Sequence, residues 1–250
     1  MKRKRAWSLL TLLLLYTATL AAQSLDEQVR RWAISGSWGG NWPIVAKNTT
    51  SGKVLSSASQ HTLKLEYYIP ATRFSIKGGY LGEEIRMGAS DVTASLSQIE
   101  LGGRYYLLPQ RFMVQPYCGL SAACNLSPRT DEGVIAESSY NPVKQEYQQI
   151  RQCRYAVREP LFSIAPSVGA DIYFLSCFAF TVEYDFRLGI DGRMKGEITS
   201  VLPGQSGTVQ SNGMRQGFMI GVKVNFPFTF TQKDGSSILN WLDDLIYGNN

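Results

Sequence analysis

The sequence predicts an all-β protein: an eight-stranded antiparallel up-and-down barrel that crosses a membrane and is followed by a short C-terminal amphipathic helix. Three observations carry this prediction. Eight segments alternate large apolar residues with small or polar ones, which is the period of a strand with two different faces. The connections between these segments alternate between short and long. The chain also begins with the three-part pattern of a secretory signal peptide.

The predicted signal peptide covers residues 1–22. Four basic residues at positions 2–5 precede an apolar run from Ala6 to about Leu20, and the small residues Ala21 and Ala22 follow. A membrane-anchor helix is the alternative, but the run is shorter than the roughly 20 residues of a comfortable span. The formal charge is +5, and removal of the four basic residues leaves 5 − 4 = +1. This balance gives no support for binding to nucleic acid.

The barrel is expected within residues 23–228, and each strand is recognised by its alternation. The clearest run, from Phe178 to Leu188, carries Phe, Val, Tyr and Leu on one face and puts Glu183, Asp185 and Arg187 on the other. The fifth run is weaker because its Gly, Ala and Ser residues blur the two faces. In chain order the runs are Trp32 to Trp42, Leu63 to Ile69, Phe74 to Tyr80, Ile99 to Leu107, Phe112 to Cys124, Phe162 to Phe174, Phe178 to Leu188 and Phe218 to Phe226.

The connections set the topology. Three are tight turns, around Pro70–Arg73, Leu108–Arg111 and Leu175–Cys177. The other four are long, roughly 43–61, 81–95, 125–160 and 190–213. A sheet with every short turn on one side and every long loop on the other has the layout of a transmembrane barrel.

Volume decides which face points outward. An eight-stranded barrel has an interior just wide enough to be filled by side chains or to hold one small ligand. The large apolar residues cannot all fit inside, so they must face outward, where only a bilayer accommodates so large an apolar surface. A soluble lipocalin-like carrier is the alternative fold, and Gly36-Ser37-Trp38 resembles the Gly-x-Trp of its first strand.

The charged residues of the small face should then line the lumen and pair with one another, because unpaired charges in a narrow interior are costly. We expect a plug of salt bridges and hydrogen bonds, with a proton or ion path as the alternative. The predicted lumen network consists of Lys64, Glu66, Lys77, Glu100, Arg104, Asp171, Glu183, Asp185, Arg187 and Lys223. Arg31 and Arg215 are further inward bases in the same pattern.

The chain resembles the small eight-stranded outer-membrane barrels of Gram-negative bacteria, the OmpA/OmpX-like class. The resemblance covers about Val29 to Phe228 and is carried by the signal peptide, Ile99-Glu100-Leu101-Gly102-Gly103-Arg104-Tyr105-Tyr106-Leu107-Leu108-Pro109, "QPYCGLSAA" and "GFMIGVKVNFPF". It implies an outer-membrane location, chain ends in the periplasm and long loops at the cell surface. Such barrels often end on an aromatic residue, whereas here Phe228 is followed by a further segment, residues 229–250.

The sequence contains no catalytic constellation, cofactor motif or metal site that we could identify. A lipid A deacylase would need a His-x-Ser-Asn pattern, and the only histidine, His61, lies in "SQHTLKLE", which does not match. The neighbouring carboxylates Glu83 and Glu84 are expected to be solvated. The main functional hypothesis is therefore a structural or adhesion barrel, with a lipid-modifying enzyme or a ligand carrier as alternatives.

Three further expectations concern the third long loop and the tail. Cys124 and Cys153 bracket most of that loop and are expected to form a disulfide. The loop interleaves aromatic and basic residues, a pattern that could bind lipopolysaccharide phosphates or a surface protein; these are Tyr147, Arg151, Arg154, Tyr155 and Arg158. The alternative is a solvated extension of the fifth and sixth predicted strands above the membrane. In residues 229–250 the apolar period becomes helical, which predicts a periplasmic helix with Trp241 as a membrane anchor. A periplasmic protein is the other surface on which this helix could dock.

Overall fold

The computed structural model describes residues 30–49, 58–87, 92–109, 112–141, 145–201 and 206–227. The predicted signal peptide, the predicted C-terminal helix and Trp241 lie outside these residues. Within them, no helix is long and apolar enough to span a bilayer.

The described residues form one antiparallel sheet of eleven strands. Their bounds are β1 (Trp32–Asn48), β2 (Ala58–Tyr68), β3 (Phe74–Met87), β4 (Val92–Tyr106), β5 (Val114–Asn125), β6 (Thr130–Asn141), β7 (Glu146–Arg158), β8 (Phe162–Tyr173), β9 (Phe178–Ile190), β10 (Arg193–Ser200) and β11 (Gly207–Phe226).

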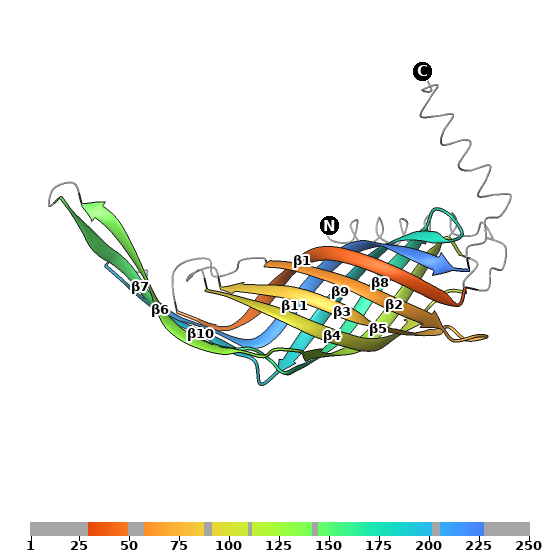
Figure 1. The fold of residues 1–250 in the computed structure, drawn as a ribbon, viewed down its shortest axis with the longest axis horizontal. Helices are drawn as coiled ribbons and strands as arrows, with labels where there is room; N and C mark the ends of the chain where they lie inside the picture. The colour runs from red at the N-terminus through yellow and green to blue at the C-terminus, as the bar shows by residue number, and fades with distance from the viewer. Residues whose placement is uncertain are drawn as a thin grey trace, which may run out of the picture.

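Eight of these strands close into a barrel (Figure 1). Their order is β1-β2-β3-β4-β5-β8-β9-β11, and β11 pairs back with β1 from Trp32↔Phe226 to Asn48↔Val209. Closure satisfies the backbone groups of the edge strands, which a sheet in a bilayer requires. The predicted eight-stranded antiparallel barrel is therefore confirmed.

The period-two alternation places the apolar residues on the outside of this barrel. Along β9, Phe180 and Tyr184 are exposed, whereas Thr181, Glu183 and Asp185 between and beside them are buried. Elsewhere on the outer surface, Trp38 is 65% exposed and Leu101 is 64% exposed. In water these side chains would form a very large apolar patch, so the outer face is the surface that contacts lipid.

Aromatic pairs mark the end of the barrel that carries the tight turns, which we call the turn end. Trp32 and Tyr67 lie on neighbouring strands with ring centroids 4.6 Å apart, and the Phe74 and Tyr105 rings are 4.8 Å apart. Cross-strand aromatic pairs stabilise antiparallel sheets, and belts of aromatic residues are typical of the membrane interface of such barrels.

Three strands, β6, β7 and β10, extend beyond the opposite end of the barrel and form what we call the arm (Figure 1). β10 pairs with the first residues of β11, from Met194↔Ser211 to Ile198↔Gly207. β7 pairs with β10, and β6 pairs with β7, so that β6 is the outermost strand of the sheet.

The arm corrects the expectation of long loops at 125–160 and 190–213, because most of those residues lie in strands. The expected loop at 81–95 is also largely strand, since β3 and β4 remain paired as far as Met87↔Val92. β1 likewise continues to Asn48, well into the expected loop at 43–61. The strands therefore continue past the lipid-facing belt and are joined only beyond it.

A separate apolar core holds the arm to the barrel. Met194 and Ile198 of β10 alternate with exposed residues and face the outer ends of β3 and β4. The cluster of buried residues consists of Ile85, Ala94, Leu96, Cys153, Val157, Met194, Ile198 and Val209. Burying this set stabilises the extension of the strands in the same way that a core stabilises a small domain.

Candidate functional site in the barrel interior

All ten residues of the predicted lumen network lie inside the barrel, and each is at most 5% exposed. They come from β2, β3, β4, β8, β9 and β11. On each strand they occupy the alternate positions opposite the lipid-facing residues, because successive side chains of a strand point to opposite faces.

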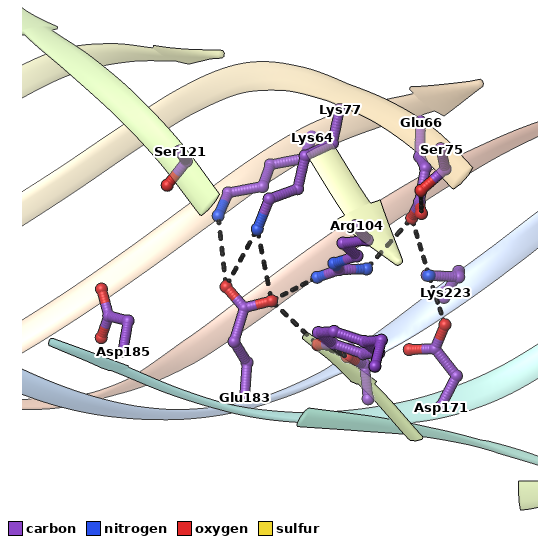
Figure 2. Close-up of polar contacts among 12 residues, drawn as sticks. Lys64, Glu66, Ser75, Lys77, Arg104, Ser121, Asp171, Glu183, Asp185 and Lys223 are labelled. Atoms are coloured by element: carbon purple, nitrogen blue, oxygen red, sulfur yellow. Dashed lines mark hydrogen bonds and ion pairs between the residues drawn. The ribbon is translucent and has the colours of Figure 1, made fainter. Parts of the chain in front are cut away.

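Glu183 of β9 is the centre of this network (Figure 2). Its carboxylate lies 3.1 Å from Nζ of Lys77 and 3.8 Å from Nζ of Lys64, and it also pairs with the guanidinium of Arg104. The hydroxyl of Tyr117 donates a hydrogen bond of 2.8 Å to the same carboxylate. One carboxylate thus joins side chains from four other strands.

Toward the turn end, Arg104 and Lys223 continue the chain of charges (Figure 2). Arg104 reaches Glu66 at 3.0 Å, and Nζ of Lys223 lies 2.7 Å from Glu66 and 2.5 Å from Asp171. The hydroxyl of Tyr106 lies 2.8 Å from Glu66 and 3.0 Å from Asp171, which places it between the two carboxylates.

Toward the arm end, the chain runs through Glu100 and Arg187. Glu100 lies 2.8 Å from Lys64 and 3.1 Å from Arg187. Arg187 also contacts Asp185 at 2.9 Å. Beyond it, Arg215 of β11 pairs with Glu83 of β3, with 2.7 Å between Nε and Oε1.

Glu83 is the member of the network that sequence reasoning missed. It is 3% exposed, whereas the adjacent Glu84 is exposed as expected for a solvated carboxylate. The sequence did indicate this position, because Glu83 is an even number of residues from the inward Lys77 and such residues of a strand share a face. The structure also corrects Arg31, which is exposed; the preceding Arg30 is buried and stacks over the ring of Tyr173 at 3.6 Å.

The ion pairs balance. Six cations take part, namely Lys64, Lys77, Arg104, Arg187, Arg215 and Lys223. Six carboxylates face them, namely Glu66, Glu83, Glu100, Asp171, Glu183 and Asp185. Ionised groups are tolerated in an interior when they are paired with opposite charges. The arrangement fills the lumen with side chains from the turn end to the arm end.

There is no candidate metal centre among the described residues. No group of three or more His, Cys, Asp and Glu side chains there could hold a metal ion. His61 lies on the outer surface, with its ring 5.8 Å from that of Tyr80.

The expected disulfide between Cys124 and Cys153 is not formed. Asn125, next to Cys124, donates a hydrogen bond to Glu159 at 3.1 Å, so the ends of β5 and the arm meet at that level. Cys153 lies six residues before Glu159 on β7, which is about 20 Å further along the arm at the rise of a strand. A disulfide requires Cα atoms within roughly 7 Å, so the strand geometry separates the two thiols.

The aromatic and basic residues of the third expected loop are divided between the two faces of the arm. Arg154 and Arg158 are exposed on the outer face, which continues the lipid-facing surface of the barrel. Tyr155 is half-buried on the other face and packs against the arm core. Tyr147 lies at the far end of β7, 76% exposed, and forms an edge-on ring pair with Tyr140.

A closed antiparallel eight-stranded barrel with an apolar outer belt and a charge-filled interior defines an outer-membrane β-barrel protein. No family model and no curated protein matches the chain. Among solved structures it is similar to Neisserial surface protein A, at 11% identity and a TM-score of 0.47, over 78% of this chain and 97% of that one. It is also similar to the outer membrane protein OprG from Pseudomonas aeruginosa, at 15% identity and a TM-score of 0.44, over 80% of this chain and 97% of that one. The attachment invasion locus protein Ail of Yersinia pestis matches at 12% identity and a TM-score of 0.42, over 80% of this chain and 100% of that one.

Proposed function

We propose that this protein is a non-conducting outer-membrane barrel whose role is interaction: the plugged barrel anchors the arm, and the arm meets partners at the cell surface. The observation that carries the proposal is the continuous set of buried ion pairs from Lys223 and Asp171 at the turn end to Arg215 and Glu83 at the arm end. It supports an anchoring role for the barrel, because an interior occupied by paired side chains leaves no water-filled path for solutes.

Conductance tests the first half of the proposal. Full-length protein inserted into planar bilayers should show no steady pore, and a Glu183→Ala variant should show at most brief openings, because it removes the shared partner of Lys64, Lys77 and Arg104. A stable open channel in the unaltered protein would contradict the plug.

Crosslinking in intact cells tests the second half. A photo-crosslinking residue in place of Tyr147, at the exposed far end of the arm, should capture a surface partner, and the same residue in place of Ala71, in a tight turn, should not. If the crosslinker at position 147 captures no protein or glycan when the cells are attached to the surfaces they bind, the interaction role is wrong.

A separate measurement addresses lipid modification. The lipid A of cells with and without the protein should have the same mass spectrum, since the proposal includes no lipid-modifying reaction.

The proposal also retains a role for residues 229–250, which lie outside the described part of the chain. We propose that they form a periplasmic helix held at the membrane interface by Trp241. Proteolysis in membrane vesicles tests this, because a docked helix should be cut at Lys233 and resist cutting after Trp241.

A further inference from the structure

At the arm end of β8 and β9, the outer surface of the sheet changes from apolar to charged residues. Phe162 and Ile190 pair across β8 and β9 at the arm end of the barrel and are 51% and 54% exposed. They are the last apolar residues of the lipid-facing belt on these two strands. Three residues after Ile190, the same outward surface carries Arg193.

Two arginines face each other at this level. Arg193 of β10 is directly opposite Arg158 of β7 in the strand register, and both are exposed. Like charges in directly opposite positions of an antiparallel pair are unfavourable. An anion placed between the two guanidinium groups would offset this repulsion.

A hollow in the outer face of the arm lies beside these arginines. Lys195 is opposite Ala156, whose small side chain leaves the space open, and Lys195, Arg158 and Arg193 line it. Two acidic residues, Asp191 and Glu132, also line it, so cations outnumber carboxylates by three to two.

The carboxylates do not close the hollow to an anion. Asp191 pairs with Arg158, but their side chains are 62% and 59% exposed, and exposed ion pairs contribute little. The carboxylate of Glu197 is held by Lys195 at 2.5 Å. A hydrogen bond from Lys195, followed by its charge, lowers the pKa of Glu197, so Glu197 stays ionised at neutral pH and remains the partner of Lys195. Of the three cations that line the hollow, Arg158 and Lys195 thus have carboxylate partners and Arg193 has no ion pair within the described part of the chain.

From this arrangement we infer that the hollow binds the phosphorylated headgroup of an outer-leaflet glycolipid, with the phosphate between Arg158, Arg193 and Lys195. Guanidinium groups bind phosphate oxygens through paired hydrogen bonds. The acyl chains of the same molecule would lie on Phe162 and Ile190, directly below, in continuity with the lipid-facing belt. This inference rests on the proposed function in one respect, that the arm end lies on the outer side of the membrane.

Lipid retention by the full-length protein tests the inference. Protein in neutral detergent is titrated with diphosphorylated lipid A, and bound lipid is counted by native mass spectrometry. The Arg193→Gln/Lys195→Gln variant is compared with Arg31→Gln/Arg73→Gln, which removes two exposed cations at the turn end. Circular dichroism and heat-modified gel migration verify that each variant is folded.

We expect the arm variant to bind lipid A about tenfold or more weakly, because each lost hydrogen bond to a charged group is worth about that factor, and the turn-end variant to change binding less than about twofold. Fully dephosphorylated lipid A should bind the unaltered protein as weakly as lipid A binds the arm variant.

The inference would be overturned by equal lipid A binding by both variants, by equal binding of the dephosphorylated lipid, or by full displacement of lipid A by inorganic phosphate alone. Displacement by a soluble sulfated polysaccharide at matched charge would instead assign the hollow to a glycan and would also overturn it. The binding assay is independent of conductance, so an open pore would overturn the proposed function without altering this result.

Discussion

Arg215 and Glu83 face each other across the barrel although two strands, β1 and β2, separate their own strands in the sheet. Nε of Arg215 lies 2.7 Å from Oε1 of Glu83, and Nη2 lies 2.5 Å from Oε2. Gln98 donates a further hydrogen bond of 2.6 Å to the same carboxylate. The pair therefore cross-links the interior at the level where the barrel meets the arm core.

The first prediction concerns this pair. Glu83→Gln should lower the free energy of unfolding by about 3–5 kcal/mol, because it leaves the guanidinium of Arg215 buried without its carboxylate. Glu84→Gln is the matched control on the next, exposed residue and should change stability by less than about 0.5 kcal/mol. Urea unfolding in lipid vesicles, followed by tryptophan fluorescence, measures both.

A double variant that replaces both partners completes this experiment. Glu83→Leu/Arg215→Met should regain most of the loss, since apolar replacement of a whole buried pair is often close to neutral. If Glu83→Gln and Glu84→Gln destabilise equally, the pair is not the cross-link that its geometry indicates.

The second prediction concerns space inside the barrel. A Cβ atom on Gly169 would lie 2.5 Å from the hydroxyl oxygen of Tyr117 and 2.4 Å from the carbonyl oxygen of Val182. Gly169→Ala should therefore destabilise the barrel by about 1–3 kcal/mol, as overpacking does. Gly36, on the outer face, has its nearest atom 4.0 Å away, so Gly36→Ala should be tolerated under the same urea assay. Equal effects at the two positions would mean that the interior is not tightly packed around Tyr117.

The barrel and its two faces could be predicted from the sequence because both follow from alternation within single strands. Glu183, Asp185 and Arg187 are separated by lipid-facing residues, so their parity alone assigned them to the interior. The pairing partners were not predictable in the same way. Which cation meets Glu183 depends on strand order, register and the tilt of the barrel, and none of these is local in sequence.

The arm was the main feature that sequence reasoning did not predict. Met194, Gly196 and Ile198 do alternate with charged residues, but the run is short and its buried face is completed by Ile85 and Leu96, about 100 residues away. The length of the connections located the strand ends correctly at the turn end, where the connections are tight. It did not locate them at the arm end, because there the strands of each hairpin continue beyond the lipid-facing belt.

The third prediction treats the arm as a unit with its own core. Ile198→Asp buries an unpaired charge in the apolar cluster, so the arm should lose its packing while the barrel remains closed through β9, β11 and β1. Trypsin should then cut at Arg151, Arg154 or Lys195 in vesicle-embedded protein, with heat-modified gel migration of the barrel unchanged. Thr199→Asp, one residue along on the exposed face, is the control and should leave the arm resistant. Loss of the folded barrel in the Ile198 variant would show that the arm and barrel are a single cooperative unit.

The fourth prediction fixes the orientation in the membrane, on which the role of the arm depends. The background for labelling replaces all four cysteines with serine, so that each variant carries a single introduced thiol. A cysteine at Ser138 of the arm should react with a membrane-impermeant thiol reagent on intact cells, because β6 is the outermost strand and its side chains are exposed there. A cysteine at Ala71, in the tight turn between β2 and β3, should react only after the outer membrane is permeabilised. Labelling of Ala71 but not Ser138 on intact cells would invert the barrel, place the arm in the periplasm and remove the basis for a surface partner.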